Sequence, residues 1–100
     1  MQLEELQQSR FSELLQSEFQ VLDDPAAEFA VRLVEVIDRS NTPHQEVFTL
    51  LFHGPANYFI SQGIHKLKHR NLGEIEIFLV PVGQDKDGFH YEAVFNRFVS

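Results

Sequence analysis

Five histidines are the groups in this chain that titrate near neutral pH, and two of them are four residues apart. On an α-helix this spacing would bring His65 and His69 onto one face, within reach of a shared metal ion. On a strand, which rises about 3.3 Å per residue, the same spacing separates them by roughly 13 Å. Their segment, residues 64–69, has the pattern of a strand. We therefore predict that these two histidines share no metal ion.

A second set of residues, His53, His90 and Glu92, contains the side chains that enzymes use for acid–base catalysis. Their positions match no arrangement of nucleophile, base and orienting group. Ser61 lacks the glycine-flanked turn that exposes a nucleophilic serine. The sequence therefore predicts no catalytic residues, and we expect a protein that is not an enzyme.

Asp85, Asp87 and Gly88 are residue types that begin a calcium-binding loop. The carboxylate that such a loop needs at its twelfth position is missing. The Asp87-Gly88 pair instead supplies a position that tolerates positive φ, as the tight turn of a β-hairpin requires. We predict a hairpin turn here, and we expect neither a metal ion nor a cofactor.

Lys66, Lys68 and Arg70 form a local basic cluster in a chain whose formal net charge is −7. If their segment is a strand, the two lysines lie on one face and the two histidines on the opposite face. These three basic residues could form a strip that binds an anion or a partner protein. The alternative is a solvated edge strand whose lysines discourage aggregation.

Six aromatic side chains fall on the expected strands and could surround the interior of a barrel. There they would line a cavity for an apolar ligand. In a chain of 100 residues, a narrow barrel is normally filled by its own side chains. A filled core and a ligand cavity both stay open for this set, which comprises Phe48, Phe52, Phe78, Phe89, Tyr91 and Phe95.

The composition, with 43% hydrophobic residues, is that of one globular domain, and we assign residues 1–100 to it. Cysteine is absent, which excludes disulfides, thiolate zinc sites and cysteine nucleophiles. No apolar run approaches the about 20 residues of a membrane helix, and the first ten residues lack the features of a secretory signal. The net charge disfavours binding to duplex nucleic acid and to anionic membranes. We expect a soluble, cytoplasmic protein.

The strongest structural signal is a long hairpin over residues 74–96, in which both strands alternate with a period of two. On the first strand, Glu74 and Glu76 give way to Phe78 and Val80 on one face, so we expect that end to be covered on both sides. Tyr91 on the return strand is expected to keep its hydroxyl beside a polar partner. The expected core face holds Ile75, Ile77, Leu79, Val82, Phe89, Tyr91, Ala93 and Phe95.

Shorter alternating segments precede this hairpin, and they predict strands over residues 19–22, 29–37, 46–53 and 64–69. A slip in the alternation at residues 35–37 predicts a β-bulge. Leucines and Phe11 recur at three- to five-residue spacing near the start, which predicts an N-terminal helical segment over residues 1–17. Residues 19–98 then form an antiparallel β domain.

This order of elements predicts a mostly β fold. We expect a small antiparallel β-barrel or curled sheet of about six strands, with one N-terminal α-helix. An open flat sheet is disfavoured because several strands carry apolar residues on both faces. The alternative is an α+β, cystatin-like arrangement in which the helix packs on the antiparallel sheet.

Three phrases of the sequence carry a family resemblance: FTLLFHGP at residues 48–55, FLVPVG at 78–83 and YEAVFN at 91–96. Together they are similar to a family of small bacterial domains, domain of unknown function 6916, from about residue 11 to residue 98. The resemblance implies a mostly β domain and no activity, because the family has no established catalytic residues. It also implies an accessory role, because members are sometimes encoded beside phage-tail-like proteins. Ile64-His65 departs from the Thr-Tyr pair more usual there.

Two functions remain open on this basis. The first is a non-enzymatic protein-interaction or assembly module, accessory to a phage-tail-like assembly, with an unidentified protein partner and a monomeric or weakly homo-oligomeric state. The second is a small β-barrel carrier for an apolar small molecule. A filled core with an exposed apolar patch would support the module, and an internal void lined by phenylalanines would support the carrier.

Overall fold

The computed structural model describes residues 8–23, 29–40 and 42–98, and for residues 97 and 98 it describes only the backbone. The described residues form six strands and one helix: α1 (Gln8–Ser12), β1 (Glu18–Val21), β2 (Phe29–Asp38), β3 (Gln45–Pro55), β4 (Gly63–His69), β5 (Gly73–Asp85) and β6 (Gly88–Phe98). All the strand pairs are antiparallel. The mostly β class and the six strands predicted from the alternating segments are confirmed.

The strands close into a barrel in the order β1-β2-β3-β6-β5-β4. The longest ladder joins β3 to β6, from Gln45 opposite Phe98 to Pro55 opposite Gly88. The ring closes through a short contact between β1 and β4, where Val21 lies opposite Leu67. A closed ring leaves no open sheet, so the cystatin-like alternative does not describe this fold.

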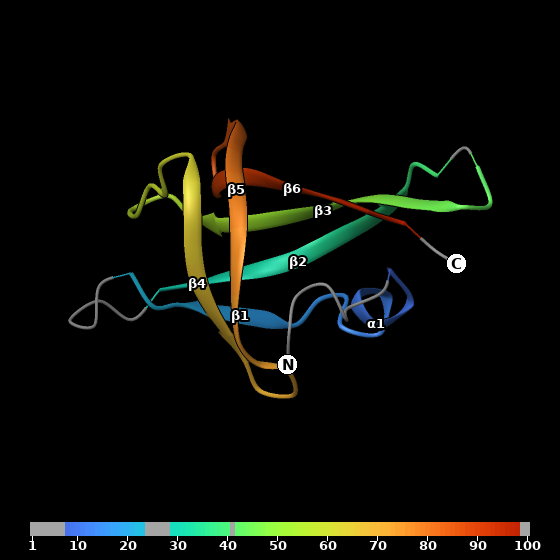
Figure 1. Cartoon of the computed structure of the whole chain (residues 1–100). Coiled ribbons are helices and arrows are strands. Elements are labelled where there is room, and N and C mark those ends of the chain that lie inside the picture. The colour runs from blue at the N-terminus through green and yellow to red at the C-terminus, as the bar shows by residue number, and fades with distance from the viewer. Residues whose placement is uncertain (1–7, 24–28, 41, 99–100) are drawn as a thin grey trace.

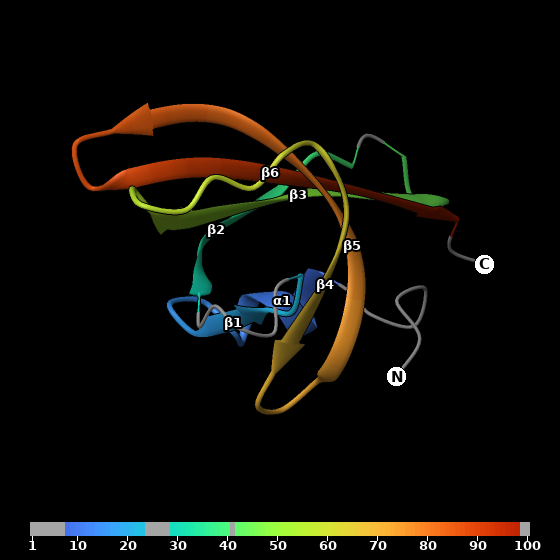
Figure 2. The ribbon, with the colours of Figure 1, turned by 90° about the vertical axis from the view of Figure 1, so that its left-hand side faces the viewer.

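β5 forms a corner of the barrel by changing partners along its length. Its first half, Gly73 to Leu79, pairs with β4, and its second half, Val80 to Asp85, pairs with β6. In Figure 1, β4 and β5 cross the direction of β2, β3 and β6, and Figure 2 shows β5 curving between the two directions. A bulge between Pro81 and Gly83 accompanies this bend, as proline in a strand predicts.

Val82 is not in the core, because strict alternation puts it on the side of Phe78 and Val80, opposite the buried residues of β5. Ile75, Ile77 and Leu79 are buried, as the alternation predicts. Val82 is the extra residue between the pairs Pro81–Tyr91 and Gly83–His90, and its side chain is 52% exposed. The predicted cover over the opposite face of β5 is also wrong, because Phe78 is 50% exposed.

The N-terminal helical segment ends earlier than predicted. α1 ends at Ser12, a turn follows, and Gln16 adopts a φ of 70°. Residues 1–7 of the predicted segment lie outside the described residues. α1 nevertheless contributes Phe11 to the core, where its ring lies 5.9 Å from that of Phe48 and 5.5 Å from that of Phe95.

Aromatic side chains fill much of the interior. Phe19 meets Phe52 edge to face at 5.4 Å, and Phe48 stacks on Phe95 at 5.1 Å. Each such burial contributes about 1.5–3 kcal/mol. The hydroxyl of Tyr91 accepts a hydrogen bond from the buried backbone N–H of Ile60, 2.9 Å away, which confirms the polar partner expected for it. Within the described residues, no helix has the length and apolarity needed to cross a membrane.

Candidate functional site

Two histidines are placed side by side by the long β3–β6 ladder. His53 on β3 lies directly opposite His90 on β6, so both side chains leave the same face of the barrel wall. Their ring centroids are 4.8 Å apart and the rings meet edge to face. Both histidines are partly exposed, and neither belongs to the hydrophobic core.

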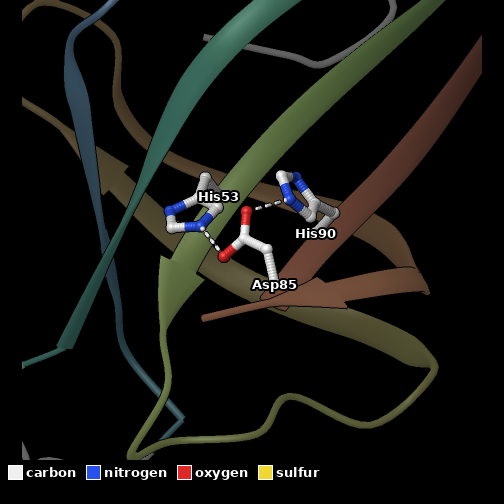
Figure 3. A group of neighbouring side chains, drawn as sticks. All are labelled: His53, Asp85 and His90. Carbon is white, nitrogen blue, oxygen red and sulfur yellow. Dashed lines mark hydrogen bonds and ion pairs between the residues drawn. The ribbon is translucent and has the colours of Figure 1, made fainter. Parts of the chain in front are cut away.

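Asp85, the last residue of β5, inserts its carboxylate between the two imidazole rings (Figure 3). Its Oδ2 lies 2.7 Å from Nε2 of His90, and its Oδ1 lies 3.3 Å from Nε2 of His53. The backbone N–H groups of Asp87 and Gly88 also donate to Oδ1, at 2.8 and 2.9 Å. The carboxylate therefore has a fixed orientation, set by the turn that follows it.

The turn itself is the tight hairpin predicted from Asp87-Gly88. Asp85 pairs with Gly88, so Lys86 and Asp87 are the two turn residues. A Cβ atom on Gly88 would lie 1.9 Å from the carbonyl oxygen of Gly54 on β3. Glycine is required here because the hairpin must approach β3 closely enough to bring Asp85 beside His53.

Hydrogen bonds determine the charge state of the Asp85 carboxyl. The His90 imidazole, the backbone N–H of Asp87, the His53 imidazole and the backbone N–H of Gly88 together hold the pKa of Asp85 well below its ordinary value of 3.8. Burial acts in the opposite direction and is outweighed. Asp85 is therefore a carboxylate at neutral pH, with one oxygen saturated by backbone donors and the other facing His90.

An open groove of about 570 Å³ lies next to this histidine pair, with His53 in its wall. Arg32 of β2 also lines it, and Arg32 is the residue directly opposite His53 in the β2–β3 ladder. The other lining residues are Glu18, Phe29, Ala30, Gly54, Pro55, Asn57 and Asp87. This groove is mostly polar, unlike the apolar ligand cavity considered from the sequence.

A family model described as "Domain of unknown function (DUF6916)" matches residues 6–95. The chain belongs to this family. Comparison with curated proteins and comparison with solved structures each gave no match. The family predicted from the sequence is thus confirmed, and the family description names no activity.

The structure brings Asp85, and not the expected Glu92, to the two histidines. Glu92 points to the same face as His90 and lies opposite Leu51 and Val80. Of these residues, His53, Asp85 and His90 have ligand atoms that all lie within 4.8 Å of one another. The hairpin spacing of Asp85 and His90 is visible in the sequence. Nothing local in the sequence brings His53 to them.

His65 and His69 lie on β4 with separate partners, as their spacing on a strand predicts. His65 bonds through Nδ1 to the carboxylate of Asp23 and through Nε2 to the carbonyl of Ser61, 2.6 Å away. His69 is buried, with 3% of its surface exposed. Its Nδ1 accepts the backbone N–H of Asn71 at 3.0 Å, and its Nε2 lies 2.9 Å from the hydroxyl of Ser17.

The basic residues Lys66, Lys68 and Arg70 are exposed, with both lysines on the outer face of β4. The ladder places Glu76 opposite Lys66 and Glu74 opposite Lys68. These carboxylates compensate the lysine charges across the strand pair. The strip is therefore a mixed-charge surface and not a cluster of unopposed cations.

The six aromatic residues considered for a ligand cavity occupy three environments. Phe48, Phe52 and Tyr91 are buried, and Phe89 and Phe95 pack against the core while remaining partly exposed. Phe78 lies on the outer face of β5, so its assignment to an interior cavity is wrong. The alternation placed Phe78 opposite the core face, and only the assumption of a second covering layer brought it inside.

Proposed function

We propose that this domain is a non-enzymatic protein-interaction module that binds its partner through the outer surface of β4, β5 and β6. The observation that carries the proposal is an exposed apolar set on these three strands. Ile64 is 70% exposed and lies directly opposite Phe78, which is 50% exposed. Val82 and Val94 are 52% and 60% exposed. We call these four residues the outer apolar face.

The ladder register places Ile64, Phe78 and Val94 of this set on one surface. Val80 lies opposite Glu92; Phe78 precedes Val80 by two residues, and Val94 follows Glu92 by two. Phe78 and Val94 therefore leave the sheet on the same side, and Ile64 extends the row onto β4. Groups of exposed apolar residues rimmed by polar ones are typical of protein-binding surfaces.

The rim of this face specifies the chemistry of the partner. Glu92 on β6 lies beside Val80 on the same side of the sheet as Phe78, and Lys66 compensates the charge of Glu76 on β5. The whole chain has a net charge of −7. We therefore propose a partner protein whose binding surface is apolar at its centre and basic at its edge. An accessory role in a phage-tail-like assembly is the narrower form of this proposal.

The filled interior supports the module over the carrier. Phe11, Phe48 and Phe95 form a mutual aromatic cluster inside the barrel, and Phe19 packs on Phe52. The groove beside His53 has a largely polar lining. An apolar small molecule would need space that these side chains already occupy.

The test is capture of a partner from the lysate of the source cells by the tagged domain and by two double variants. Ile64→Ser/Phe78→Ser removes the centre of the outer apolar face, and Lys68→Glu/Arg70→Glu changes the neighbouring basic residues. We expect one stoichiometric, basic partner that the wild-type domain and the lysine–arginine variant retain. The serine variant should bind that purified partner at least tenfold more weakly in calorimetry.

Two outcomes contradict the proposal. One is a partner that the serine variant binds as tightly as the wild-type domain. The other is a dimer of the isolated domain, seen by light scattering, that the serine variant abolishes, because the face would then bind a second copy of this chain. Circular dichroism of each variant checks that its fold is retained.

A further inference from the structure

The proposed interaction surface leaves the histidine pair on β3 and β6 without a role. His53, Asp85 and His90 offer two imidazole nitrogens and a carboxylate, with all ligand atoms within 4.8 Å of one another (Figure 3). Two histidines with one carboxylate are a recurrent ligand set for zinc and for other first-row transition metals. The three side chains come from three different strands, which gives the group a rigid base.

The separations of the ligand atoms are close to those that a metal ion imposes. Bonds of about 2.0–2.1 Å in tetrahedral geometry place neighbouring ligand atoms about 3.3 Å apart. The separation from His90 Nε2 to Asp85 Oδ2 is 2.7 Å, and that from His53 Nε2 to the other carboxylate oxygen, Oδ1, is 3.3 Å. The widest pair, at no more than 4.8 Å, would close by about 1.5 Å. Small rotations of two partly exposed rings suffice for that movement.

The hydrogen bonds around Asp85 leave a suitable ligand atom free. Its Oδ1 accepts the backbone N–H groups of Asp87 and Gly88. Such outer contacts orient a carboxylate and are typical of protein metal sites. Its Oδ2 has no backbone donor in this network and faces Nε2 of His90. A metal ion at Oδ2 would replace the proton that His90 now shares with it, and the turn contacts would stay intact.

We propose that His53 Nε2, Asp85 Oδ2 and His90 Nε2 bind one divalent first-row transition-metal ion per chain. Mixed imidazole and carboxylate ligands suit Zn²⁺, Co²⁺ and Ni²⁺, whereas Mg²⁺ and Ca²⁺ prefer oxygen ligands alone. The side chains of the three ligands are 26–43% exposed. Water or a group from a bound molecule therefore completes the coordination.

The test uses tag-free, chelator-treated protein and ZnCl₂ in titration calorimetry. The wild-type chain binds one Zn²⁺, and His53→Ala and His90→Ala each weaken binding by tenfold or more. His44→Ala is the matched control, because His44 is an exposed histidine in the β2–β3 connection, outside this group. Cobalt(II) gives a second readout, since its visible spectrum reports the coordination geometry.

Nuclear magnetic resonance of the wild-type protein keeps the test independent of variant stability. On addition of Zn²⁺, the imidazole nitrogen signals of His53 and His90 shift, and those of the buried His69 stay unchanged. Three results would overturn the site: no stoichiometric binding, equal binding by the His53→Ala/His90→Ala variant, or shifts at His44 or His65 instead. Binding of Mg²⁺ with the same affinity as Zn²⁺ would overturn the proposed class of ion.

Discussion

His69 on β4 and the His53–His90 pair on β3 and β6 show how one residue type behaves on the two sides of a barrel wall. His69 is almost fully buried, and both of its ring nitrogens have partners within the chain. His53 and His90 are partly exposed and share one carboxylate. The inner imidazole therefore stabilises the fold and has no free ring nitrogen to bind a ligand. The two outer rings are partly exposed, so the nitrogens that bond Asp85 can bind another ligand instead.

The partners of His69 also determine its protonation. The Asn71 N–H donates to Nδ1, so Nδ1 carries no proton. The Ser17 hydroxyl donates to the carbonyl of Leu14, so it accepts the Nε2–H of His69. Burial, with a smaller effect of the nearby Arg10, lowers the pKa of His69 below 6.5. A neutral ring is therefore part of the folded structure.

The largest expected difference between the two regions is in stability. His69→Ala removes a ring that lies 4.6 Å from Phe19 and leaves the Asn71 N–H without its acceptor. We expect a loss of about 3 kcal/mol in the free energy of unfolding. His53→Ala should cost less than about 1 kcal/mol. Urea denaturation of both variants measures the difference, and equal losses would remove the distinction.

A finer change isolates one hydrogen bond of the inner histidine. Ser17→Ala leaves the Nε2–H of His69 without an acceptor, while the Leu14 carbonyl keeps the backbone N–H of Ser17 at 3.1 Å. We expect a loss of about 1–2 kcal/mol in urea denaturation. Ser61→Ala is the control, because Ser61 is exposed and contacts His65 through its carbonyl. A cost for Ser61→Ala equal to that of Ser17→Ala would contradict this interpretation.

A weaker effect follows from the lowered pKa of His69. The unfolded chain binds a proton near pH 6.5 and the folded chain does so only at lower pH, so stability is full above pH 6.5 and declines as the pH falls below it. We expect the urea concentration at the unfolding midpoint to decrease as the pH is lowered from 7 to 5. His69→Ala should show a smaller slope over this range, and an unchanged slope would place the titration elsewhere.

The sequence predicted those features that depend on neighbouring residues. The period-two alternation located the strands, and Asp87-Gly88 located the tight turn, because both signals are local. Val82 was misplaced because its assignment to the core face departed from the alternation, which puts it on the side of Phe78 and Val80. The helical segment was overestimated because leucine spacing does not show where α1 ends.

The candidate metal site could be predicted only in part. Asp85 and His90 flank one hairpin turn, so their proximity follows from the turn. His53 joins them through the β3–β6 ladder, which pairs residues far apart in the sequence. Strand order depends on how the whole barrel closes, and no local pattern in the sequence encodes it.

The smallest expected change in stability concerns Asp85 of the outer group. Asp85→Asn keeps a side-chain oxygen for the N–H groups of Asp87 and Gly88 and loses the carboxylate charge, so in metal-free buffer at pH 7 we expect Tm to fall by no more than about 3 °C. Because folding lowers the pKa of the Asp85 carboxyl, its stabilisation is present above pH 3.8 and is lost as the pH falls further. The gap in Tm between wild type and variant should therefore narrow progressively as the pH falls below about 4. A gap that stayed constant down to pH 2 would show that the charge of Asp85 does not stabilise the outer group, in contrast to the neutral ring of His69 on the inner side.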